Sequence, residues 1–285
     1  MKQMSTKDFA GLVLVVLLGE LILCIRFSGN LADDFIALFL SFGAAFLFYF
    51  LTGWVLEFVQ DKKWAKPITL AVLLPLIVVS GAWCVVQFSY YASSVMLGGA
   101  SVMLPFLLLG GLGAFAAVKG ERVLSKLAVV SAFLCLVLLV ILTAVALRFV
   151  TPRYLVPHTV PTLGGMTTGA LTNGLPLLSS VLSLAVLGKG VKKRGATAGF
   201  IGAVLASFAT LAVTAGILTD ELAATQSYPF TVAVSAASMG QIFSRLDGLL
   251  YSVGFFTCLM KTSACFLAAI ILAREIISLI NIWKN

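Results

Sequence analysis

The feature that most constrains this chain is the length of its uncharged stretches. No charged side chain occurs at 35–56, 127–147, 154–188 or 195–219, and none occurs from 67 to 118. A helix that crosses the hydrocarbon core of a membrane needs about 20 apolar residues at about 1.5 Å each. The apolar residues are continuous rather than alternating, which excludes a β-barrel and predicts an all-α integral membrane protein.

The composition agrees with this interpretation. Apolar residues make up 61% of the 285 positions and charged residues only 11%, whereas soluble domains have about 45–50% and about 25%. A soluble fold of this length has too little interior to hide the excess, so much of it must face the lipid bilayer. The net charge of +8 does not indicate nucleic-acid binding, because that function needs a basic face on a soluble body.

We expect about eight transmembrane helices. The stretch from 67 to 118 must hold two of them, because a single helix of that length would reach about 78 Å. The polar residues 89–94 are the natural turn between these two. The expected spans are 9–28, 35–57, 67–90, 97–118, 126–148, 166–188, 195–219 and 246–273.

Lysine and arginine in the loops predict the orientation, because positive side chains accumulate on the cytoplasmic side. With a cytoplasmic N-terminus, the outer segments hold only Arg26, Arg148, Arg153 and Arg245. The remaining basic residues outside the spans lie in the inner segments: Lys2, Lys7, Lys62, Lys63, Lys66, Lys119, Arg122, Lys126, Lys189, Lys192, Lys193, Arg194, Arg274 and Lys284. Both termini are therefore expected in the cytoplasm.

Two ionisable side chains interrupt the spans near their midpoints, Glu20 in the first and Lys261 in the eighth. A charge inside a membrane costs a few kcal/mol, so such residues are candidates for function. Because their signs are opposite, they could form a structural ion pair that joins two helices. Alternatively, each could face a hydrated cavity.

The sixth span is unusually polar for a membrane helix. It contains Gly174 and Pro176, which relax and interrupt the backbone, and it carries hydroxyl and amide groups at Thr172, Asn173, Ser179 and Ser180. This pattern predicts a broken helix that lines a cavity, where freed N–H groups could receive a substrate carboxylate. The alternative is an ordinary proline kink whose hydroxyls bond back to the backbone.

Other candidate groups give weaker signals. Asp33 and Asp34 are predicted to form a solvated outer turn, His158 lies in an outer loop away from acidic or cysteine partners, and 231–243 could form a short helix on the bundle. The five cysteines are expected to be buried free thiols: Cys24, Cys84, Cys135, Cys258 and Cys265. No catalytic triad, zinc motif or phosphate-binding loop occurs, so we expect neither an enzyme nor a cofactor or metal site.

Several motifs in the second half resemble one family. They are Tyr228-Pro229, then Arg245-Leu246-Asp247 at the start of the eighth span, then Lys261 fourteen positions beyond the aspartate. Val160 to Gly165 resembles the segment that leads into that family's sixth span. Together they resemble the spore germination permeases, the B subunits of germinant receptors in spore-forming Firmicutes, most clearly over 160–273.

The resemblance implies an amino acid–polyamine–organocation superfamily fold like that of the leucine transporter. That fold has two inverted five-helix repeats, here 1–150 and a truncated 151–285 with three spans in place of five. The first helix of each repeat is broken, which implies ligand binding by Gly19, Glu20 and the sixth-span residues Thr172, Asn173, Gly174, Pro176, Ser179 and Ser180. Lys261, with Glu20, would occupy the position where related transporters bind a coupling sodium ion.

The implied function is a receptor subunit that senses a small molecule, expected to be an amino acid, in the inner membrane of the spore. Its partners would be the A-type and C-type receptor subunits. The alternatives are a stand-alone secondary amino-acid transporter and a membrane scaffold that binds no ligand. The sequence departs from the family at 175–180, where Leu-Pro-Leu-Leu-Ser-Ser replaces a usual Phe-Pro-Phe-Gly-Glu.

Overall fold

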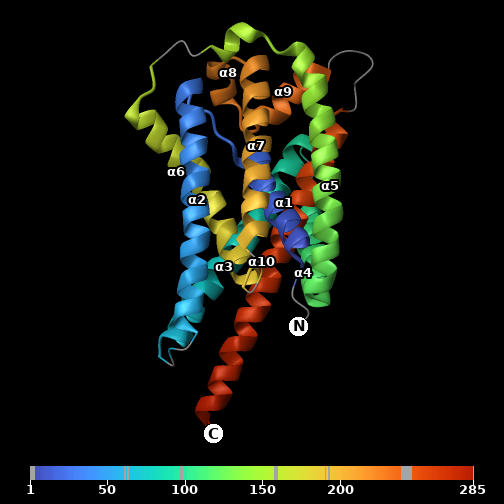
Figure 1. Cartoon of the computed structure of the whole chain (residues 1–285). Helices are drawn as coiled ribbons and strands as arrows, with labels where there is room; N and C mark the ends of the chain where they lie inside the picture. The colour runs from blue at the N-terminus through green and yellow to red at the C-terminus, as the bar shows by residue number, and fades with distance from the viewer. Residues whose placement is uncertain are drawn as a thin grey trace.

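The computed structural model describes residues 4–60, 62, 64–96, 99, 101–156, 160–189, 191, 193–238 and 246–284. These residues form helices joined by short connections (Figure 1). The long helices are α1 (Thr6–Cys24), α2 (Leu31–Val59), α3 (Ala65–Tyr91), α4 (Met103–Lys119), α5 (Glu121–Ala146), α6 (Leu163–Leu187), α7 (Lys193–Ile217) and α10 (Leu246–Lys284). The shorter elements are a π-helical turn (Ala92–Met96), two 3-10 turns (Leu147–Phe149 and Pro152–Leu155), α8 (Asp220–Thr225) and α9 (Pro229–Ser238).

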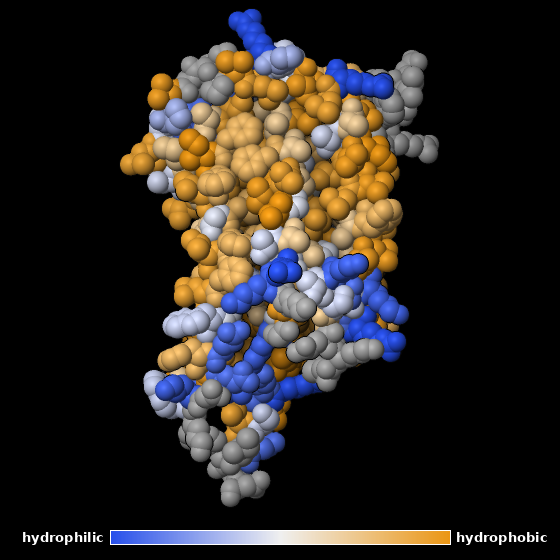
Figure 2. All heavy atoms as spheres, in the orientation of Figure 1, coloured by the Kyte–Doolittle hydropathy of each residue, from blue (hydrophilic) through white to orange (hydrophobic). Residues whose placement is uncertain are grey.

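The fold is an all-α membrane fold, as the uncharged stretches predict. Among the described residues, six helices are long and apolar enough to cross a membrane, namely α2, α3, α5, α6, α7 and α10, and α4 is a shorter apolar helix. Each expected span overlaps one long helix, including α1, whose charged residues are Lys7, Asp8 and Glu20. Apolar side chains cover most of the face shown in Figure 2, and hydrophilic ones gather mainly toward one end.

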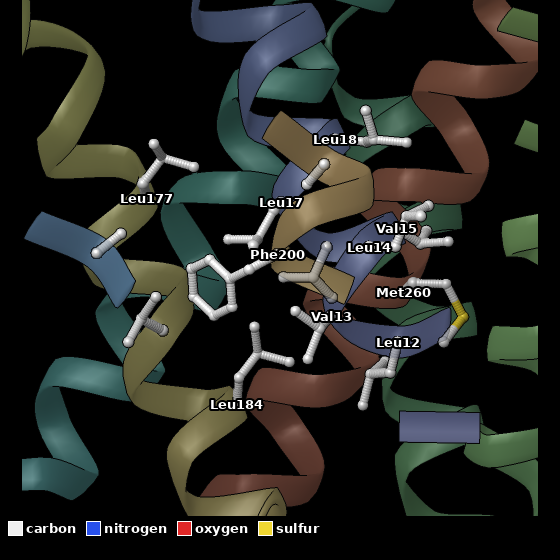
Figure 3. Close-up of a cluster of buried hydrophobic side chains, with 14 of the residues drawn as sticks. Leu12, Val13, Leu14, Val15, Leu17, Leu18, Leu177, Leu184, Phe200 and Met260 are labelled. Atoms are coloured by element: carbon white, nitrogen blue, oxygen red, sulfur yellow. The ribbon is translucent and has the colours of Figure 1, made fainter. Parts of the chain in front are cut away.

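Helix α1 lies at the centre of the bundle. It packs against α5, α7 and α10, while α2 lies along α6, and α3 and α4 pack on α10 (Figure 1). Its side chains are buried on all sides: Leu12, Val13 and Leu17 are fully buried, and they meet Leu184 and Phe200 in the core (Figure 3). A helix that is apolar all round belongs in the interior, where packing rather than amphipathicity places it.

Both termini lie at one end of the bundle, and α8 and α9 lie at the other (Figure 1). We call these the terminal end and the outer end. The short helix expected at 231–243 corresponds to α9, Pro229–Ser238, and 239–243 lie outside the described residues. His158 and Arg245 also lie outside them.

The prediction of a solvated turn at Asp33 and Asp34 is wrong, because both side chains are buried at the outer end. Asp33 accepts hydrogen bonds from the backbone N and the Oγ1 of Thr162, at 2.8 and 3.0 Å. Asp34 accepts one from the backbone N of Ser28 at 2.8 Å. The carboxylates are buried because they satisfy N–H groups at the start of α6 and in the segment before α2.

The prediction of a broken sixth span is also wrong, because α6 runs without interruption through Pro176. The hydroxyl of Ser179 donates to the carbonyl oxygen of Pro176 at 2.7 Å, so a polar group near the proline is satisfied within the helix. The hydroxyl of Thr172 likewise donates to the Thr168 carbonyl at 2.8 Å. The first span does lose helical structure, since α1 ends at Cys24 and 25–30 are not helical.

Four cysteines behave as predicted. The thiols of Cys84, Cys135, Cys258 and Cys265 are free and buried, and the side chain of Cys24 lies outside the description. Such thiols pack as small apolar groups. They contribute to the helix contacts without forming a disulfide framework.

Candidate functional site

The two charged residues inside the membrane meet at the centre of the bundle. The ammonium of Lys261 on α10 forms an ion pair with Oε1 of Glu20 on α1. The hydroxyl of Ser180 on α6 donates to the same oxygen at 2.9 Å. Lys261 is 2% exposed and Glu20 6%. Three helices far apart in the sequence are therefore joined by one neutral polar cluster, which consists of Glu20, Ser180 and Lys261.

Close packing between α1 and α10 positions this cluster. A Cβ atom on Gly19 would lie 2.7 Å from the Cβ of Thr257, a separation that real side chains do not tolerate. Gly19 therefore contributes by its missing side chain, which lets the backbone of α1 approach α10. The adjacent Glu20 is consequently held within reach of Lys261.

A small crevice borders the cluster, and a larger groove lies beside it. The crevice has a volume of 10 Å³ and includes Glu20, Lys261 and Thr257, so it has room for about one water molecule. The groove has a volume of 610 Å³ and runs between α3 and α6. Trp83 and Gln87 of α3 line both spaces, so the groove and the crevice are neighbours across these two side chains.

The remaining sixth-span candidates separate into three positions. Thr172, Pro176 and Ser179 line the groove. Asn173 does not: its Oδ1 accepts from the backbone N of Arg26 at 2.9 Å and its Nδ2 donates to the Arg26 carbonyl at 3.3 Å. Gly174 faces α2, where a Cβ would contact Ser41 at 3.6 Å. Asn173 thus anchors the non-helical segment after α1, and Gly174 serves the packing of α6 on α2.

Sequence reasoning missed three residues that face the groove: Arg26, Trp83 and Gln87. A signal for Gln87 existed, because it is the one amide side chain between 67 and 118. Arg26 directly follows the first apolar stretch, and its Nη1 is 3.5 Å from the Ser227 carbonyl oxygen. Trp83 offered no signal, since nothing local shows which side of an apolar helix faces a groove.

These groups can recognise a small polar molecule by hydrogen bonding and charge. Arg26 supplies a cation at the groove, Gln87 and Ser179 supply hydrogen-bonding groups, and Trp83 supplies an aromatic surface. No group of three or more histidine, cysteine or acidic side chains that could hold a metal occurs in the part of the chain that the structure describes.

Sequence comparison connects this geometry to a family. The family described as spore germination protein matches residues 87–282, more than half of the chain. The chain belongs to the spore germination protein family. The matched range begins near the end of α3 and continues into the last turn of α10, so it includes Gln87, Ser180 and Lys261 but not Glu20. No curated protein matches the chain.

The fold of this family member is that of a membrane transporter. It is similar to Mhp1, a nucleobase-cation-symport-1 family transporter whose structure is closed with bromovinylhydantoin bound. The TM-score is 0.59 at 12% sequence identity, and the similarity covers 96% of this chain and 71% of Mhp1. At this identity the likeness concerns the fold alone. Together, the family and the fold identify a multi-pass membrane permease.

Proposed function

We propose that this permease is the membrane subunit of a spore germinant receptor and senses a small molecule, an amino acid or a similar compound. The observation that carries the proposal is the open groove between α3 and α6, which adjoins a buried ion pair in a member of the spore germination family. A buried charge pair beside a cavity is typical of sites that bind or couple ligands in membranes.

In this proposal the ligand occupies the groove, with its carboxylate toward Arg26. Its other polar groups lie toward Gln87, Thr172 and Ser179. Glu20 and Lys261 form the coupling centre beneath it. Gly19, Asn173, Gly174, Pro176 and Ser180 support the site through the backbone and helix contacts described above. Ligand binding would draw α3 and α6 together, and the ion pair would transmit this movement to α1 and α10.

The proposed location is the inner membrane of the spore, with both termini cytoplasmic and the A-type and C-type receptor subunits as partners. The charge distribution supports this orientation, since most loop lysines and arginines lie in segments assigned to the terminal end. Reporter fusions after Arg194 and after Asn285 should both report a cytoplasmic position. An external C-terminus would refute the orientation.

The site is tested with a matched pair of threonine variants on α6. The hydroxyls of Thr167 and Thr172 both donate to carbonyls one turn back, at 2.9 and 2.8 Å, but only Thr172 lines the groove. Spores that carry Thr172→Val should need a higher concentration of amino-acid germinant, by about tenfold for a lost ligand contact of about 1.4 kcal/mol. Spores that carry Thr167→Val should respond like wild type; equal responses from both variants would contradict the assignment.

A second candidate function is transport without a receptor complex, which the transporter fold favours. Proteoliposomes that contain only this chain distinguish the two functions. Uptake of labelled amino acid, lost in Lys261→Met, would support transport. Saturable binding without uptake would support the receptor subunit.

A further inference from the structure

A second pocket lies apart from the groove, toward the terminal end of the bundle. The last third of α2, the end of α6 and the start of α7 enclose its volume of 380 Å³. This volume falls in the range of small-ligand sites, about 300–1,000 Å³. None of the residues assigned above to the ligand groove or the polar cluster lines it.

Two lysine side chains lie at this pocket, one on each side of the turn between α6 and α7. The Lys189 ammonium lies 3.7 Å from a carboxylate oxygen of Glu275, and its side chain is 33% exposed. The Lys193 ammonium lies 5.8 Å from the centre of the Phe50 ring, and Lys193 is exposed. Neither lysine is enclosed by its protein partner, so both ammonium groups can reach an anion in the pocket.

A buried hydroxyl also reaches the pocket. Tyr49 is 8% exposed and lines the cavity, and a Cβ on Gly188 would lie 2.5 Å from its hydroxyl oxygen. That hydroxyl makes no hydrogen bond to any residue within the described ranges. The absence of a side chain at Gly188 therefore makes room for the Tyr49 hydroxyl, which can donate to an acceptor in the pocket.

The charge and the apolar surroundings of the pocket define the acceptor. Glu57 also lines the cavity, and Glu275 pairs with both Lys189 and Lys66. The three lysines and two glutamates at and beside the pocket therefore leave one positive charge, which matches a single phosphodiester. On the adjoining face of α2, Leu47, Leu51 and Trp54 are 70, 54 and 60% exposed. Their spacing places them in one row along the helix. The acyl chains of a lipid anion could lie along this row, whereas a free anion would make no favourable contact with it.

We propose that this pocket binds the phosphodiester headgroup of an anionic phospholipid. The ammonium groups of Lys189 and Lys193 and the hydroxyl of Tyr49 contact the phosphate oxygens, and an acyl chain follows α2. Basic pockets between transmembrane helices hold anionic headgroups in this way. The bound lipid links the turn between α6 and α7 to the end of α2. The proposal requires only the membrane fold and is independent of the germination function.

The test measures thermal unfolding of the full chain in detergent, with phosphatidylglycerol, phosphatidylcholine or inorganic phosphate added. Wild type should be stabilised by phosphatidylglycerol more than by phosphatidylcholine. The double variant Lys189→Gln/Lys193→Gln should need a higher lipid concentration, by roughly fivefold for each lysine lost. Tyr49→Phe should weaken the lipid effect without changing the net charge.

The matched control is Lys119→Gln/Lys126→Gln, which removes two exposed lysines at the adjacent ends of α4 and α5 and should keep the full lipid effect. Each shift is measured against the same variant without lipid, so changes in basal stability cancel. Should the double variant fail to fold, the two single lysine variants give the same comparison. The proposal is overturned by an undiminished shift in the pocket variants or by an equal shift with phosphatidylcholine. An equal shift with inorganic phosphate would also overturn it, because the site would then bind a free anion rather than a lipid.

Discussion

Two grooves beside the central helices differ in what fills them. The groove between α1 and α10 is occupied by α5, whereas the groove between α3 and α6 is open. The inverted repeat that we propose matches α1 to α6, α2 to α7 and α3 to α10. When each helix is replaced by its repeat partner, the contact between α1 and α7 corresponds to the contact between α6 and α2. The groove between α1 and α10, which α5 fills, then corresponds to the open groove between α6 and α3.

The side chains on the two sides differ accordingly. Small residues of α5 fill the first groove, where a Cβ on Gly11 would contact Ala132 at 3.5 Å. The second groove exposes Gln87, Thr172 and Ser179. Polar groups inside a membrane need water, a ligand or protein partners. The comparison indicates that the filled groove holds the bundle together and that the open one gives access to its polar centre.

The largest expected difference is in chemical accessibility. A cysteine at Thr172, which is exposed in the open groove, should react with a small maleimide roughly tenfold or more faster than one at Ala132, which is buried on α5 beside Gly11 of α1. Mass spectrometry of the purified chain measures both rates, with the unmodified chain and its buried thiols as background. Equal rates at the two positions would show that the grooves do not differ in access.

The next effect concerns the ion pair that lies between the two grooves. Glu20→Gln or Lys261→Met alone leaves a buried charge without its partner and should lower the free energy of unfolding by about 3–5 kcal/mol. The double variant should recover most of this loss, because it removes both charges. Unfolding in mild detergent measures the cycle, and additive losses would mean that the two residues act separately.

The smallest effect tests close packing. Gly19→Ala places a Cβ 2.7 Å from Thr257 and should destabilise the chain by about 1–3 kcal/mol. The control is Gly111→Ala on α4, where no atom lies within 4 Å of the added Cβ. This change should stabilise the helix by roughly 0.5–1 kcal/mol. Similar effects from both variants would exclude a special role for the contact between α1 and α10.

The positions of the spans could be predicted because uncharged runs are a local property. The pairing of Glu20 with Lys261 was one of two alternatives that the sequence left open, because a charge in a membrane needs either a partner or water. The continuity of α6 could not be predicted, since a proline inside a helix can either kink or break it, and the packing of the neighbouring helices decides which. Trp83 was missed because its role depends on which helix packs beside α3. The eighth span was expected to end at 273, and α10 continues beyond it to Lys284; in this extension Glu275 pairs with Lys66 and Lys189.

The uninterrupted length of α10 has a mechanical consequence. Lys261 at the centre and Glu275 at the terminal end belong to one rigid rod (Figure 1), about 21 Å apart at 1.5 Å per residue. A tilt of about 5° around Lys261 would therefore displace Glu275 by about 2 Å. Its ion pairs with Lys66 and Lys189 are 3.7 Å long, so this lever arm would break or re-form them. A rotation too small to open the core would thus change the ion pairs of Glu275 at the surface.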